Sequence, residues 1–155
     1  MEFTKIDQID RAILRALQTD GRASIQELSE QVGLSPSPCS RRIRILEDDG
    51  VIDGYFALIN EPKIGYAVTV FVSVKLDKQI DDALQTFEAA ILSYLEVVDC
   101  WLMTGTRDYL LRVVTSDLTE FEAFLTSRLT KISCVASIES AIPLRRVKAG
   151  MSRLA

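Results

Sequence analysis

The chain has 155 residues, of which 48% are hydrophobic, and its formal net charge is −4. That hydrophobic content indicates packed cores rather than disorder, and the length allows one ordinary domain or two small ones. Histidine is absent, which excludes the commonest general base and most zinc-site patterns. No long apolar run or signal-peptide pattern is present, so we expect a cytoplasmic protein that contacts no membrane.

A first helix is predicted near the N-terminus. Asp7 is a suitable cap residue, Asp10 falls in the first turn, where acidic side chains are favourable, and Gly21 closes the segment. We expect its apolar face to pack against the two helices that follow. That face comprises Ile6, Ile9, Ile13 and Leu17.

Residues 24–46 predict a helix-turn-helix, in which two short helices meet at a tight turn. Ser24 and Glu27 have the spacing of a capping box, in which each side chain binds the other residue's backbone amide. Gly33 can adopt the left-handed conformation that ends a helix, so the first of the two helices should stop just before it.

The second helix should run from about Pro36 to Asp49, because a Ser-Pro-Ser-Pro start provides cap and first-turn residues. Its exposed face contains arginines and no acid, which suits DNA phosphates and guanine edges, although an isolated basic face could also be plain solvated surface. Arg42 lies nearer the apolar stripe and would contact either a phosphate or a neighbouring helix. The acidic run 47–49 should keep the last turn out of the groove. The buried face is Cys39, Ile43 and Leu46, and the candidate DNA-binding residues are Ser35, Ser37, Ser40, Arg41, Arg42 and Arg44.

After this helix, residues 51–58 are rich in β-branched and aromatic side chains. They predict a short strand pair or a wing that leads out of the domain. Asn60-Glu61-Pro62-Lys63 is the predicted linker, since proline and polar residues mark a break. We therefore expect a winged helix-turn-helix domain over residues 1–60 and a second domain over residues 61–155.

The second half predicts a ferredoxin-like βαββαβ domain, which makes the fold class α+β. Residues 68–76 alternate apolar and polar side chains, as in a strand with one buried face. Two helices can cover only one face of the sheet, so a second subunit should cover the other face, which includes Phe71. We expect a homodimer that assembles further into a tetramer or octamer. The later elements are a helix over 83–94, strands over 97–104 and 109–115, a helix over 118–132 and a strand over 135–147.

Short motifs follow one another along the whole chain in a specific order. They are Ile9-Asp10-Arg11-Ala12-Ile13-Leu14, Asp20-Gly21-Arg22, Glu27-Leu28-Ser29, Val32-Gly33-Leu34-Ser35-Pro36, Pro38-Cys39, Arg42-Ile43, Leu46-Glu47, Gly50-Val51-Ile52, Gly54-Tyr55, and later Gly105 with Asp108-Tyr109. In order and spacing the chain resembles the leucine-responsive regulator/AsnC (Lrp/AsnC) family of transcription factors. The resemblance implies a winged helix-turn-helix that binds double-stranded DNA and a C-terminal domain that senses a ligand and oligomerises.

The turn at residues 104–109 is the candidate site for a small molecule. Its glycine lets backbone amides approach a carboxylate and Asp108 could hold an ammonium group, which suits an amino acid, although an ordinary hairpin turn uses the same residue types. The resemblance favours binding, because the family binds amino acids at this turn, between subunits. Many relatives have an acidic and an aromatic residue where this chain has Thr106 and Arg107, so Arg107 either pairs with a ligand carboxylate or stays solvated. The candidate effector-binding residues are Leu102, Met103, Thr104, Gly105, Thr106, Arg107, Asp108, Tyr109, Ser133, Ser137 and Ile138.

The expected function is a transcriptional regulator whose DNA binding or assembly responds to an amino-acid effector. Two alternatives are an architectural DNA-binding protein of low sequence specificity and an amino-acid-binding regulatory subunit of a metabolic enzyme. Catalysis would require Cys39 as a nucleophile at a helix start, but its apolar face argues for burial. Cys100 and Cys134 are also expected to be buried free thiols, and we expect no cofactor, no metal and no enzymatic activity.

Overall fold

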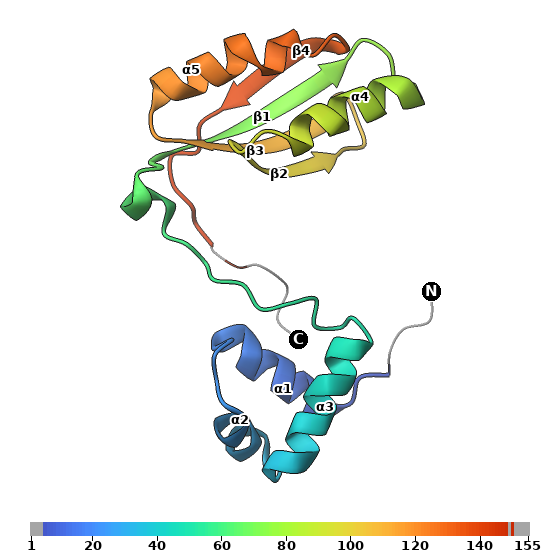
Figure 1. The fold of residues 1–155 in the computed structure, drawn as a ribbon, viewed down its shortest axis with the longest axis vertical. Helices are drawn as coiled ribbons and strands as arrows, with labels where there is room; N and C mark the ends of the chain where they lie inside the picture. Colours follow the sequence, from blue (N-terminus) through green and yellow to red (C-terminus); the bar gives the residue numbers. More distant parts are fainter. Residues whose placement is uncertain (1–4, 149, 151–155) are drawn as a thin grey trace. The chain divides into compact units, whose positions relative to one another are not determined.

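The computed structural model of this protein describes residues 5–148 and 150 (Figure 1). The chain forms two compact units, and the break between them falls after Leu58. The N-terminal unit contains only helices, whereas the C-terminal unit, Ile59–Val147, combines a sheet with helices. Each unit has its own cluster of buried apolar side chains.

Three helices build the N-terminal unit: α1 (Gln8–Thr19), α2 (Ile25–Val32) and α3 (Pro36–Asp48). The predicted capping box at Ser24 and Glu27 is formed, and Gly33 ends α2 with φ of 70°. A second capping box, between Asp7 and Asp10, starts α1. Capping side chains satisfy amides that the first turn of a helix leaves unpaired. The predicted starts of α1 and α2 are therefore confirmed by the caps that form there.

The core of this unit lies where the three helices meet. Its fully buried members come from all three helices, which explains why a short two-helix motif needs α1 as a packing partner. Val51 and Ile52 pack against the same core, after their amides have bonded back to the carbonyl of Leu46. The buried members are Ile13, Leu28, Cys39, Ile43 and Leu46.

The strand pair predicted for residues 51–58 does not form in the single chain. The described residues include no strand in this segment, and residues 53–58 make no backbone hydrogen bond with one another or with other described residues. A strand requires a pairing partner, and the described part of the chain supplies none here. The segment instead leads out of the N-terminal unit as an extended stretch, with the Phe56 side chain 72% exposed.

The C-terminal unit has the predicted βαββαβ order. Its strands form one antiparallel sheet in the order β2-β3-β1-β4, and α4 and α5 lie on the same side of it (Figure 1). This is the ferredoxin-like arrangement. The elements are β1 (Val68–Leu76), α4 (Asp81–Leu92), β2 (Val97–Leu102), β3 (Tyr109–Thr115), α5 (Leu118–Ser127) and β4 (Val135–Ala141), with short 3-10 turns η1 (Glu61–Ile64) and η2 (Leu129–Lys131).

The helices α4 and α5 pack against one face of the sheet and not against the other. Sheet side chains that point towards α4 and α5, among them Val72 and Leu111, form the core together with Phe87 of α4. Among the described residues no α-helix lies over the opposite face, which we call the open face (Figure 1). Register places Phe71, Trp101, Leu110 and Arg112 on the open face, because their strand neighbours point into the core.

Several details differ from the prediction. β4 ends at Ala141 instead of residue 147, shortly before Pro143, which has no amide to donate. The helix predicted over 118–132 ends at Ser127 and continues only as η2. The predicted linker at Asn60–Lys63 forms η1 in part. Cys100 was wrongly expected to be buried; it is exposed, because β2 is an edge strand, whereas Cys39 and Cys134 are buried free thiols.

Candidate nucleic-acid interface and effector site

The second helix of the motif, α3, has one buried and one exposed face. Cys39, Ile43 and Leu46 are buried, as predicted from their spacing. The side chains of Arg41 and Arg44 are exposed on the other side and form no hydrogen bond or ion pair with the residues that the structure describes. Two free guanidinium groups on one helix face can bind phosphates or the acceptor edge of guanine.

The serines at the start of α3 differ in their surroundings. Ser35 occupies the N-cap position, but its side chain makes no capping hydrogen bond, so its hydroxyl is free for an external acceptor or donor. Ser37 is exposed and Ser40 is half-buried. Pro36 and Pro38 have no amide hydrogen, so in the first turn of α3 the Ser37 amide can donate to an anion but these two positions cannot.

Arg42 lies differently from its two neighbours. Its Nη1 donates to Asp7 at 2.8 Å and to Asp10 at 2.7 Å, so it bridges α3 and the first turn of α1. The sequence left two contacts open for Arg42, a phosphate or a neighbouring helix. In the structure Arg42 contacts the neighbouring helix, α1. Spacing alone could not identify Asp7 and Asp10 as its partners, because they precede it by more than 30 residues.

The end of α3 is acidic and tied to the segment that follows it. The Tyr55 hydroxyl donates to Glu47 at 3.0 Å. Burial and this contact with a carboxylate raise the pKa of Tyr55 to about 12, so the phenol stays protonated at neutral pH. Asp48 and Asp49 are exposed, and negative charge at this end of α3 is unfavourable next to DNA phosphates.

In the C-terminal unit, the predicted effector turn joins β2 and β3. Residues 102–106 are exposed, and Gly105 has φ of 120°, a conformation that side chains rarely permit. The amide of Met103 donates to the carbonyl of Asp108 at 2.8 Å and closes the turn. The exposed backbone of this turn is accessible to a small ligand.

Asp108 lies under the turn rather than on its surface. It is 3% exposed, and its carboxylate accepts the backbone amide of Leu76 at 2.7 Å and the side-chain amide of Gln79. Both carboxylate oxygens therefore have partners within the chain. Tyr109 is also buried, with its ring 4.5 Å from that of Phe87 and its hydroxyl donating to Glu88 at 2.7 Å.

Arg107 forms a charged group on the open face. Its guanidinium donates to the Ser137 hydroxyl at 2.7 Å and to Glu139 at 2.8 Å, both on β4. The structure thus brings together two predicted residues, Arg107 and Ser137, and adds Glu139, which the prediction missed. The signal for Glu139 was its position two residues after Ser137, which places both side chains on the same face of a strand.

Two other predicted effector residues lie apart from this group. Ile138 points to the opposite face of β4 and packs against the core. Ser133 borders a separate shallow hollow with Asp77, Lys78 and Thr86. Alternation along a strand already puts Ser137 and Ile138 on opposite faces, whereas Ser133 precedes β4, where no such periodicity applies.

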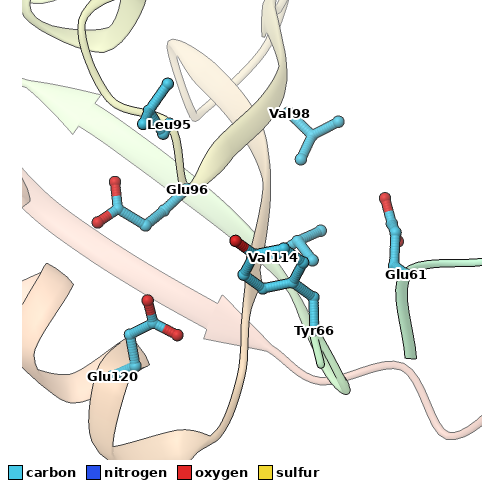
Figure 2. A pocket seen from close by; sticks show the side chains of 7 residues that line it. All are labelled: Glu61, Tyr66, Leu95, Glu96, Val98, Val114 and Glu120. Carbon is cyan, nitrogen blue, oxygen red and sulfur yellow. The ribbon is translucent and has the colours of Figure 1, made fainter. Parts of the chain in front are cut away.

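A larger hollow, of about 290 Å³, lies at the other end of β3 and was not predicted. Figure 2 shows the Tyr66 ring between Glu61 on one side and Glu96 and Glu120 on the other. Each carboxylate has a partner: Arg112 for Glu61, Arg128 for Glu96 and the Ser116 amide for Glu120. The part of the chain that the structure describes contains no group of acidic, cysteine or histidine side chains that could hold a metal ion.

A helix-turn-helix with free arginines on its second helix, together with a separate ferredoxin-like unit, defines a DNA-binding regulator with a ligand-binding domain. Comparison with family models gives the same division: residues 6–53 match a winged helix-turn-helix DNA-binding family, and residues 69–152 match the Lrp/AsnC ligand binding domain. The chain belongs to the Lrp/AsnC family of transcriptional regulators. This is a family of regulators and not of enzymes, in agreement with the prediction.

Individual relatives cover nearly the whole chain. It is 49% identical to the Bkd operon transcriptional regulator of Pseudomonas aeruginosa over 94% of this chain and 95% of that one. It is 41% identical to the leucine-responsive regulatory protein of Rhizobium meliloti, over 93% and 92%. A solved Neisseria meningitidis transcriptional regulator in complex with L-Met matches with a TM-score of 0.92 and 35% identity, covering 96% of both chains. An AsnC family regulator from Agrobacterium tumefaciens matches with a TM-score of 0.88 and 37% identity, covering 95% of both.

The helices that the structure describes are too short or too polar to cross a lipid bilayer.

Proposed function

We propose that this chain is a sequence-specific transcriptional regulator that contacts DNA through α3 and changes its DNA binding or assembly when an amino acid binds between subunits. The observation that best supports the DNA-binding role is the pair Arg41 and Arg44, exposed and free of partners within the described residues. We assign Ser35, Ser37 and Ser40, at the start of the same helix, as further DNA contacts. In this assignment residues 1–60 bind DNA and residues 61–155 bind the effector and other subunits, in the cytoplasm.

The open face supports association of at least two subunits. It contains the exposed Trp101 beside the half-buried Leu110 and Phe71, and adjacent large apolar side chains on an uncovered sheet face are typical of an interaction surface. A homodimer can place two α3 helices in successive major grooves, about 34 to 36 Å apart. Because the net charge of −4 opposes approach to DNA, joining several DNA-binding units in a dimer, tetramer or octamer raises their effective concentration at the site.

The turn between β2 and β3 supports an amino-acid effector. It has an exposed backbone around Gly105, and Arg107 with Glu139 places both signs of charge beside it. A zwitterion needs one partner of each sign, and the related Neisseria regulator was solved with L-Met. For regulation, the amino acid must favour one quaternary arrangement over another, since equal affinity for both would shift nothing.

Two measurements on the full chain test this function. Gel-shift titration with a duplex that the protein selects from a random pool, against a random-sequence duplex at one fixed salt concentration, should show a preference of at least about 10³-fold. Equal affinity for both duplexes would instead support an architectural DNA-binding protein. A thermal-shift screen of the common amino acids, with gel filtration of each hit, should identify the effector; no stabilisation by any of them contradicts the effector proposal.

A further inference from the structure

Each of two aspartates at the start of α1 has two separate hydrogen-bonding tasks. Asp7 uses Oδ1 to accept the amide of Asp10, and Asp10 uses Oδ2 to accept the amide of Asp7, which makes the capping box. Their remaining oxygens, Oδ2 of Asp7 and Oδ1 of Asp10, both accept from Nη1 of Arg42. The capping box and the contacts with Arg42 use different carboxylate oxygens, so both can form at once. Nη1 of Arg42 therefore connects α3 to a turn whose geometry the capping box already fixes.

Apolar side chains also pack between α1 and α3. Ile13, Cys39 and Ile43 are fully or almost fully buried at this junction. Apolar burial is strong but has little directional preference, so it permits small rotations of one helix against another. Hydrogen-bonded ion pairs depend on both distance and angle, and those of Arg42 therefore restrict the rotation of α3 about its own axis.

That rotation decides which side chains can reach DNA. Successive residues on a helix are separated by about 100°, so Arg41 lies about 100° and Arg44 about 160° around the axis of α3 from Arg42. If α3 rotated about its own axis by even part of either angle, the guanidinium groups of Arg41 and Arg44 would move away from the base edges that they contact in the proposed complex. Contacts to bases require accurate placement, whereas contacts to phosphates tolerate displacement.

We propose that Arg42 is a positioning residue for DNA recognition: through Asp7 and Asp10 it holds α3 at the angle at which Arg41 and Arg44 meet the bases, and it makes no DNA contact itself. This rests on the proposed role of α3 as the DNA-contacting helix. The arrangement also partly neutralises two acidic side chains that would otherwise oppose DNA next to that helix. The side chain of Arg42 is only 30% exposed, whereas Arg41 and Arg44 are both exposed.

The decisive variant is Asp7→Asn/Asp10→Asn in the full chain. Asparagine caps helices as well as aspartate does, so α1 keeps its start, but the ion pairs with Arg42 are lost and two negative charges disappear. Electrostatics alone would make this variant bind all DNA more tightly. We expect instead that its affinity for the selected duplex, relative to a random-sequence duplex at the same salt concentration, falls at least about tenfold.

Glu30→Gln/Asp53→Asn is the matched control, because it removes the same charge from exposed positions outside the Arg42 cluster and outside α3. Its preference for the selected duplex should stay within about twofold of the wild-type value. If the two double variants behave alike, Arg42 does not position α3 and the inference is wrong. If Arg41→Ala and Arg44→Ala leave DNA binding unchanged, the proposed role of α3 fails, which is a different outcome.

A second measurement remains decisive even if the double variant unfolds. A plot of log affinity against log salt concentration has a negative slope, and its magnitude decreases by about 0.9 for each phosphate contact that is lost. Arg42→Gln should keep the wild-type slope on a random-sequence duplex, whereas Arg41→Gln should reduce its magnitude if that side chain contacts a phosphate. A reduction of about 0.9 for Arg42→Gln would show that Arg42 contacts the DNA backbone and would overturn the proposal.

Discussion

The carboxylate of Asp108 accepts the backbone amide of Leu76 at 2.7 Å, which ties the start of β3 to the end of β1. Gln79 donates to the same carboxylate from the loop that follows β1. Asp108 is thus part of the support under the effector turn, and its charge is directed into the chain. The sequence led us to expect that this charge would hold an ammonium group, and the two roles can be distinguished by experiment.

Asp108→Ala should abolish the response to the amino acid while basal DNA binding remains. It leaves the buried amide of Leu76 without a partner, at a cost of about 1 to 3 kcal/mol, and releases the turn. Asp108→Asn keeps an oxygen for that amide and should retain most of the affinity for an amino acid that stabilises the wild type. Calorimetry on both variants, with a thermal melt to confirm folding, provides the check; equal loss in both would show that the negative charge itself binds the ligand.

Arg41→Ala or Arg44→Ala should weaken binding to the selected duplex by about 1 to 3 kcal/mol if the arginine contacts a base. Neither side chain has a partner within the described residues, so folding should be unaffected. Gel-shift titration beside a thermal melt measures both quantities. The assignment of this face fails if both variants keep the wild-type affinity.

Local features of this chain could be predicted from sequence because their partners lie close along it. The capping box of Ser24 with Glu27 spans three residues, and Gly33 ends α2 by its own backbone conformation. The contacts of Arg42 and of Asp108 join residues about 30 positions apart, so no spacing rule could indicate them. Such contacts depend on how the elements pack, which is a property of the folded chain.

The same distinction explains the errors at strand ends. The prediction extended the last strand to residue 147, but a strand persists only where a neighbouring strand offers hydrogen bonds, and pairing with β1 stops at Ala141. Residues 51–58 have the composition of strands but pair with no strand among the residues that the structure describes. Sequence patterns therefore predicted which segments favour strands, and the sheet determined which of them pair.

The stability of α2 should decrease at acid pH because of Glu27. Hydrogen bonds from the backbone amide and hydroxyl of Ser24 hold the pKa of this carboxyl below its ordinary value of 4.5. A carboxyl with a lowered pKa in the folded state contributes stability above the unfolded value, and the contribution is lost as pH falls through the folded value. The contribution is therefore complete above about pH 4.5 and disappears below it.

Glu27→Gln isolates this effect, since glutamine keeps a capping side chain without the charge. The difference in melting temperature between wild type and variant should be largest near pH 7 and should shrink as the pH falls below 4.5. Thermal melts followed by circular dichroism between pH 3 and pH 7 measure it. A difference that stays constant down to pH 3 would contradict the capping contribution of the carboxylate.

Trp101→Glu should convert the assembled protein into smaller species. Trp101 lies on the open face beside Leu110, is 45% exposed in the single chain, and would bury a large apolar area against a second subunit. A carboxylate in the centre of that contact would lose its hydration without gaining a partner, which costs several kcal/mol. Leu118→Glu is a suitable control, because Leu118 is also an exposed apolar residue but lies at the start of α5, on the helical side of the sheet. Sedimentation or light scattering should show dissociation for Trp101→Glu and an unchanged mass for Leu118→Glu; the reverse pattern would place the subunit interface on the helices instead of the open face.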